Sequence, residues 1–86
     1  MNLYIGNLNY TVDEDKLREI FERYGAVTSA KIIKDKETGE SKGYGFVEMK
    51  NEEEGKKAIQ AMNTQEIDGK HIKVNIAKTR KRYYRK

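Results

Sequence analysis

The sequence predicts an α+β fold in which two helices cover one face of a four-stranded antiparallel sheet. Two observations support this prediction. Apolar residues alternate with a period of two in four segments and recur at helical spacing in two others, in the order β-α-β-β-α-β. The chain has 86 residues, of which 36% are hydrophobic and 37% are charged, so we expect one domain with a single small core.

The first predicted strand covers residues 2–8, with the sequence NLYIGNL. Side chains alternate between the two faces of a strand, so Leu3 and Ile5 should face the core and Tyr4 the other side. Gly6 and Asn7 of this segment are both residue types that favour turns, so the strand should end there.

The first predicted helix begins at Thr11, which forms a capping-box pattern with Glu14 three residues later. Four apolar residues then follow at the spacing of one helix face: Leu17, Ile20, Phe21 and Tyr24. Gly25 should end the helix in the left-handed conformation. A stripe at this spacing predicts a helix that packs on the core.

Residues 27–34 are rich in strand-forming residues and predict the second strand. Ala30 and Ile32 should face the core, whereas Lys31 and Ile33 should share the opposite face with the tyrosine of the first strand. The polar run DKETGES that follows predicts a loop with its turn near the glycine.

The third predicted strand covers residues 42–49, KGYGFVEM, and carries two aromatic rings on one face. Tyr44 and Phe46 are two residues apart and point to the same side, while Val47 and Met49 point to the core. Flat rings on an open sheet face beside a lysine are a stacking surface for unpaired nucleic-acid bases.

The second predicted helix begins at Asn51, a capping residue followed by three glutamates that suit a helix N-terminus. Its apolar stripe consists of Gly55, Ala58, Ile59 and Met62. Glycine is a poor helix former, so Gly55 indicates close packing against the sheet. Asn63 should take the left-handed conformation at the end of the helix.

The last predicted strand follows a turn at residues 67–69 and covers residues 71–77, HIKVNIA. Its alternation places three residues toward the core: Ile72, Val74 and Ile76. Four others should face outward: His71, Lys73, Asn75 and Ala77. This strand completes the ferredoxin-like β-α-β-β-α-β order, with both helices on one face of the sheet.

Residues 42–49 resemble the ribonucleoprotein octamer of the RNA recognition motif family. Six positions fit its pattern: Lys42, Gly43, Tyr44, Gly45, Phe46 and Val47. Met49 departs from the pattern, which has an aromatic residue there, but strand alternation places Met49 in the core. The NLYIGNL segment resembles the family's second signature, with Tyr4 as its aromatic residue. The resemblance covers residues 2–77; Thr64 departs from it where family members often have glycine.

The resemblance implies that the chain binds single-stranded RNA. In the family, the aromatic residues that match Tyr4 and Tyr44 each stack a base. The aromatic residue that matches Phe46 packs against the sugars between them, and the basic residue that matches Lys42 contacts phosphate. The candidate RNA-binding residues are Tyr4, Tyr44, Phe46, Lys42, Lys31, Lys73, Asn75, Asn2, Arg80 and Arg82. Preference for RNA over single-stranded DNA is implied by the family alone.

The net charge of +4 is unevenly distributed along the chain. The last nine residues hold six of the 18 basic residues: Lys78, Arg80, Lys81, Arg82, Arg85 and Lys86. Residues 1–77 hold the other 12 and all 14 acidic residues, so their net charge is −2. We therefore predict an RNA recognition motif domain over 1–77 and a basic, flexible tail over 78–86. The tail either contacts an anionic partner such as RNA or is a solvated end.

The composition argues against catalysis and bound cofactors. The chain has no cysteine and one histidine, so it offers no pairing of nucleophile and base and no thiolate or paired-histidine metal site. We therefore expect neither an enzyme nor a cofactor. Two alternatives to RNA binding stay open: a protein-interaction module on the same fold, and a general binder of single-stranded nucleic acid.

The expected compartment and oligomeric state follow from the absence of membrane-targeting patterns and from the length of the sequence. It has no apolar run near the ~20 residues that span a bilayer, and residues 1–20 show no signal-peptide pattern. We expect a monomer without a membrane partner, similar to small single-domain bacterial RNA-binding proteins. The cytoplasm is the expected compartment; the nucleus is the alternative, because the basic tail also fits a localisation run.

Overall fold

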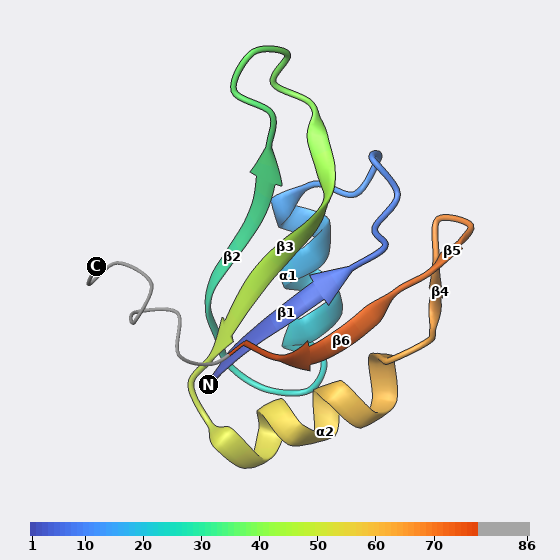
Figure 1. Ribbon diagram of the computed structural model, residues 1–86. Helices are drawn as coiled ribbons and strands as arrows, with labels where there is room; N and C mark the ends of the chain where they lie inside the picture. The colour runs from blue at the N-terminus through green and yellow to red at the C-terminus, as the bar shows by residue number, and fades with distance from the viewer. Residues whose placement is uncertain (78–86) are drawn as a thin grey trace.

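A computed structural model describes residues 1–77 and confirms the predicted α+β fold (Figure 1). The sheet is antiparallel and has the strand order β2-β3-β1-β6. Its strands are β1 (Asn2–Gly6), β2 (Val27–Lys34), β3 (Ser41–Met49) and β6 (Lys73–Ile76). The helices are α1 (Glu14–Glu22) and α2 (Glu52–Met62). In Figure 1, α1 lies behind the sheet and α2 runs below it, along β6. A separate hairpin joins β4 (Glu66–Ile67) to β5 (Lys70–His71).

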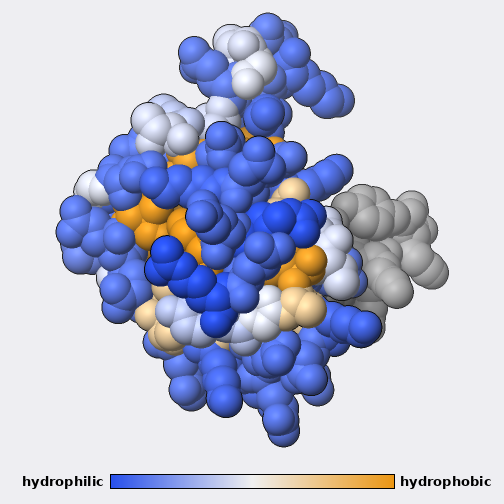
Figure 2. All heavy atoms as spheres, turned by 180° about the vertical axis from the view of Figure 1, so that it is seen from behind, coloured by the Kyte–Doolittle hydropathy of each residue, from blue (hydrophilic) through white to orange (hydrophobic). Residues whose placement is uncertain are grey.

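The core lies between the helices and one face of the sheet, as strand alternation predicts. The side chains that are fully buried there include Leu3, Ile5, Leu17, Phe21, Val47, Met49, Ile72 and Val74. The outer surface on the helix side is mainly hydrophilic, with small hydrophobic patches between the elements (Figure 2). No helix within residues 1–77 is both long enough and apolar enough to span a membrane.

The start of α1 differs from the sequence prediction. Asp13, and not Thr11, is the N-cap, and its carboxylate accepts a hydrogen bond from the backbone N–H of Lys16 at 2.8 Å. The Thr11 hydroxyl instead donates to Asp68, 57 residues away, at 3.0 Å. Glu14 does not reach back to the cap, because its carboxylate accepts from the backbone N–H of Ile32 at 3.0 Å. Tertiary partners have thus replaced the local capping box.

Gly25 and Gly55 both have close neighbours, and at Gly25 the reason differs from the expected one. Gly25 does not take a positive φ, and α1 already ends at Glu22. The Glu54 side chain occupies the place of a Cβ at Gly25 and accepts a hydrogen bond from the Ala26 N–H at 3.3 Å. At Gly55, a Cβ would lie 2.5 Å from the sulfur of Met1, so the close neighbour is the Met1 side chain that precedes β1.

The predicted strand over residues 71–77 is divided into β5 and β6. The β4–β5 hairpin turns through Asp68 and Gly69, whose φ values of 51° and 88° fit a two-residue type I′ turn. Ile72 and Val74 are buried as expected, but Ile76 is 46% exposed and does not join the core. Ile76 is the last residue of an edge strand, where one side lacks a neighbouring strand.

The edge strand β2 follows an irregular path. Its register against β3 shifts between Val27 and Ser29 and again between Ile32 and Lys34. Between these shifts, Ile32 is buried and Lys31 is exposed on the opposite face, as the sequence predicts. Ala30 is half-buried and packs against the core.

The end of α2 carries a strained residue. Asn63 has an ordinary φ of −63°, so the predicted left-handed conformation falls instead on Thr64, with φ of 72°. This conformation is unfavourable for a β-branched residue. Thr64 is nonetheless held there, because its N–H donates to the Ile72 carbonyl at 2.8 Å and its carbonyl contacts the His71 ring at 3.0 Å.

Replacing Thr64 by Gly should raise the free energy of unfolding by about 0.5–1 kcal/mol, because glycine relieves the strain at a cost in unfolded-state entropy. Urea denaturation would measure this. Thr64→Ala, which removes the branched side chain but keeps a Cβ, is the matched control and should gain less. If Thr64→Gly were no more stable than Thr64→Ala, the inference that the backbone of Thr64 is strained would be wrong.

Candidate nucleic-acid interface

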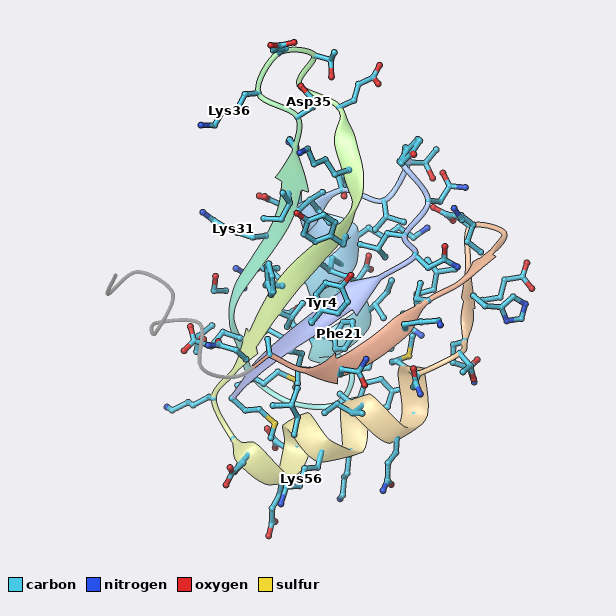
Figure 3. The ribbon with its side chains drawn as sticks, in the orientation of Figure 1. Tyr4, Phe21, Lys31, Asp35, Lys36 and Lys56 are labelled. Carbon is cyan, nitrogen blue, oxygen red and sulfur yellow. The ribbon has the colours of Figure 1, made fainter. Side chains whose placement is uncertain are left out.

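Three aromatic rings form a cluster on the sheet face that the helices leave open. The ring centroids are 5.8 Å apart for Tyr4 and Phe46, 5.9 Å for Tyr4 and Tyr44, and 6.3 Å for Tyr44 and Phe46. All three side chains are half-buried. Figure 3 shows Tyr4 over β1 on the near side of the sheet, whereas Phe21 belongs to α1 behind it. The face therefore presents flat apolar surface to solvent.

The strand register places four of the candidate residues in one row across the whole sheet. Tyr4 lies opposite Asn75 of β6 on one side and opposite Phe46 of β3 on the other. Phe46 lies opposite Lys31 of β2. We call these four residues the central row: Asn75, Tyr4, Phe46 and Lys31. It has two rings in the middle, an amide at one end and an ammonium group at the other.

Gly6 allows the Tyr4 ring to lie along β1. A Cβ on Gly6 would sit 2.8 Å from the Tyr4 hydroxyl oxygen and 2.9 Å from ring carbon Cε2. The ring therefore lies over the position two residues ahead on the same face. From the sequence, Gly6 was interpreted only as a turn former. Its position two residues after Tyr4, on the same strand face, is the pattern that could have indicated its contact with the ring.

The lysines near the rings are exposed and free of ion pairs. Lys31, Lys42 and Lys73 are all exposed, and the ion pairs found within residues 1–77 involve other basic residues. The charge of Lys42 has a small effect on Asp35. The pKa of Asp35 lies below its ordinary value mainly because the backbone N–H groups of Glu37 and Thr38 donate to its carboxylate.

Asn2 lies in the next row and has a different electrostatic environment. It is half-buried and stands opposite Glu48 of β3, an exposed carboxylate on the open face. The Asn2 carbonyl accepts a hydrogen bond from the Ala77 N–H at 2.8 Å. A contact between Asn2 and a base suits this position better than a contact with phosphate, because Glu48 would repel an anion. Arg80 and Arg82 lie outside the described residues.

The loop after β1 is tied to three other parts of the chain. The Asn7 amide donates to the His71 carbonyl at 2.7 Å, and the Leu8 N–H donates to the Gly43 carbonyl at 2.8 Å. The Asn9 amide donates to the Asp68 carbonyl at 2.8 Å. These links fix the loop beside the start of β3 and beside the hairpin.

Asp68 holds this loop through hydrogen bonds to Asn9 and Thr11. From the sequence, Asp68 was predicted only to be a turn residue. Its carboxylate accepts from the Lys16 ammonium at 3.1 Å and from the Thr11 hydroxyl at 3.0 Å. The Lys16 hydrogen bond, followed by that of Thr11, holds the pKa of Asp68 below its ordinary value. The partners are more than fifty residues away in sequence, so no local pattern could have shown the contact.

Comparison with known proteins finds a family model and relatives that match most of the described chain. A model described as the RNA recognition motif matches residues 3–73. The chain is 45% identical over 80 residues to the chloroplastic RNA-binding protein CP31B of Arabidopsis thaliana, covering 93% of this chain and 28% of CP31B. It is also 45% identical over 80 residues to RbpA of Nostoc sp., covering 93% of this chain and 78% of RbpA.

Solved structures show the same fold. The crystal structure of RNA binding protein PG1 has a TM-score of 0.89 and 48% identity, covering 92% of this chain and 95% of that one. A complex of the Sxl-lethal protein with RNA has a TM-score of 0.84 and 37% identity, covering 88% of this chain and 47% of that one. The chain thus spans nearly the whole length of the PG1 structure but less than a third of the length of CP31B.

Replacing Gly6 by Ala should displace the Tyr4 ring while the sheet stays intact, because the φ of Gly6 is not positive and alanine fits the strand. NMR would show changed ring-proton shifts for Tyr4 and altered contacts to Phe46. Lys73→Ala, at the position opposite Gly6 on β6, is the control and should leave the Tyr4 ring in place. Unchanged Tyr4 shifts in Gly6→Ala would contradict the prediction.

Replacing Asp68 by Asn should lower the free energy of unfolding at neutral pH. The folded pKa of Asp68 is depressed, so its stabilising effect is present above the ordinary value of 3.8 and is lost as pH falls through the lower folded pKa. The difference between wild type and Asp68→Asn should therefore shrink below pH 3.8. Urea denaturation across this range measures it, with exposed Glu19→Gln as the control. A difference independent of pH would contradict the assignment.

Proposed function

Because this chain belongs to the RNA recognition motif family, we propose that its open sheet face binds single-stranded RNA. The observation that carries the proposal is the central row, with two aromatic rings between an amide and an ammonium group. Unpaired bases stack on Tyr4 and Tyr44, and Phe46 packs against the sugars between them. Each stacked base contributes ~1–3 kcal/mol by alanine substitution. Related proteins named as RNA-binding, and one solved with RNA, support RNA as the ligand.

Basic residues around the rings contact the phosphates. Lys31 and Lys73 lie on the outer strands of the sheet, and Lys42 lies near the start of β3. Their ammonium groups are exposed and make no ion pair with the described residues, so RNA binding breaks no salt bridge of these lysines. Residues 1–77 carry a net charge of −2, so we infer that residues 78–86 provide much of the salt-dependent attraction.

The affinity follows from the number of stacked bases. Two or three stacking contacts, less the cost of ordering a flexible strand, give a binding free energy on the order of −8 kcal/mol, which is micromolar. The two outer ends of the central row differ, because Asn75 can hydrogen-bond a base edge while Lys31 attracts phosphate. We therefore expect the RNA strand to lie on the central row, with its bases on the rings and a phosphate near Lys31.

The alternatives are weaker for specific reasons. The same rings can stack DNA bases, so a general binder of single-stranded nucleic acid is the second candidate. A protein-interaction module would not need all three rings exposed together on the open face. A binding role rather than catalysis stays a prediction from the composition, which has no cysteine and one histidine.

We further propose that the chain acts as a monomer. Tyr10 and Ile76 are the large hydrophobic residues that are exposed within residues 1–77, and two such residues do not make an extended apolar interface. One relative is chloroplastic and another comes from Nostoc, so similar proteins occur in different settings. The cytoplasm, with the nucleus as the alternative, stays the prediction from the sequence.

Replacing both Tyr44 and Phe46 by Ala should weaken RNA binding by about 5-fold or more, since the base stacked on Tyr44 is worth at least ~1 kcal/mol and the contact of Phe46 with the sugars is lost as well. Fluorescence anisotropy with a pool of short random-sequence RNAs measures the loss, and a DNA pool of matched length compares RNA with DNA. Lys56→Ala, on the helix side, is the control and should bind like wild type.

The amide NMR spectrum would show that the double variant stays folded. A folded Tyr44→Ala/Phe46→Ala protein that binds RNA as tightly as wild type would rule out stacking on the open face. Equal affinity of the wild type for both pools would favour the general single-stranded nucleic-acid binder.

A further inference from the structure

We propose that Tyr10 forms an additional base-binding subsite beside the three sheet rings, so that the RNA tract extends past the end of β1. This inference rests on the proposed RNA binding and adds a position that the family signatures in this chain do not include. Tyr10 is 70% exposed, which is the largest exposure among the large hydrophobic residues of the described chain. An exposed aromatic ring has its faces free to stack on a ligand.

The backbone on both sides of Tyr10 is held in place. On one side, the Asn9 amide donates to the Asp68 carbonyl at 2.8 Å. On the other side, the Thr11 N–H and hydroxyl both donate to the Asn9 side-chain oxygen, at 3.0 and 3.1 Å, and the hydroxyl also reaches Asp68. An exposed ring on such an anchored loop is preorganised, so a ligand that stacks on it bears little cost of ordering the loop.

The Tyr10 ring opens onto a pocket of about 340 Å³ that is continuous with the proposed RNA surface. Tyr4 and Tyr44 line the same pocket, so the subsite and the sheet rings share two residues. The Tyr10 ring lies beside Gly43, since a Cβ built on Gly43 would be 3.4 Å from Tyr10 ring carbon Cε1, which is van der Waals contact. Tyr10 thus stands beside the start of β3.

The charges around the pocket indicate what it binds. Lys42 and Lys70 line it, and among the described residues that form its wall there is no carboxylate. Aromatic faces together with two cations fit a nucleotide, whose base stacks while its phosphate approaches an ammonium group. A neutral apolar peptide would leave both lysines without an anionic partner. The ligand of this subsite is therefore one further nucleotide of the same single strand.

RNAs of different length separate this subsite from the main site. Tyr10→Ala should weaken binding of a random hexanucleotide pool by about 5- to 100-fold, the loss expected for one stacked base. The same variant should bind a random trinucleotide pool like wild type, because three nucleotides are accommodated by the sheet rings. Tyr10→Phe keeps the ring and should retain the wild-type affinity for the hexanucleotides.

The remaining outcomes distinguish the two proposals. If the wild type binds neither pool, the proposed function itself fails. If the wild type binds both pools and Tyr10→Ala binds hexanucleotides equally well, the subsite is overturned and RNA binding stands. An equal loss for both pools would also overturn the added subsite, since Tyr10 would then support the main site. Slow hydrogen exchange of the Thr11 N–H in Tyr10→Ala, as in wild type, would show that the loop anchors are intact.

Discussion

The register between the two central strands is the constraint on which the rest of the molecule depends. β1 and β3 pair so that Tyr4 stands opposite Phe46 and Leu3 opposite Val47. Each fully buried aliphatic side chain contributes roughly 1.5–3 kcal/mol, and a slip by one residue would turn the whole buried set toward solvent. The core residues therefore fix the rings on the open face as firmly as they fix the fold. Burial on one side determines the binding surface on the other.

The parts of the fold that could be predicted from sequence are those that depend on strand and helix periodicity. Alternation in the strands placed Leu3 and Val74 in the core, and the helical stripes placed Phe21 and Ala58 there. The errors occur where a distant partner competes with a local pattern. Thr11 has the composition of an N-cap but donates to Asp68, and Asp13 caps the helix instead.

Other differences come from geometry that a linear pattern does not contain. Ile76 alternates like a core residue but ends an edge strand, and Gly25 is required for the space of the Glu54 side chain rather than for a helix end. In the site, alternation predicted the three rings, but Gly6 and Tyr10 were recognised only from the side chains that they contact. The roles of Lys31, Lys73 and Asn75 in binding RNA stay predictions, although the register now places two of them in one row with the rings.

The irregular path of β2 has a consequence for the pairing of this sheet with another chain. β2 is an edge strand, and the open edge of a sheet is a template on which a second chain can add a strand. The two register shifts and the exposed side chains of Lys31 and Lys34 interrupt the even ladder that such an addition requires. The addition of a strand from a second molecule along this edge is therefore disfavoured.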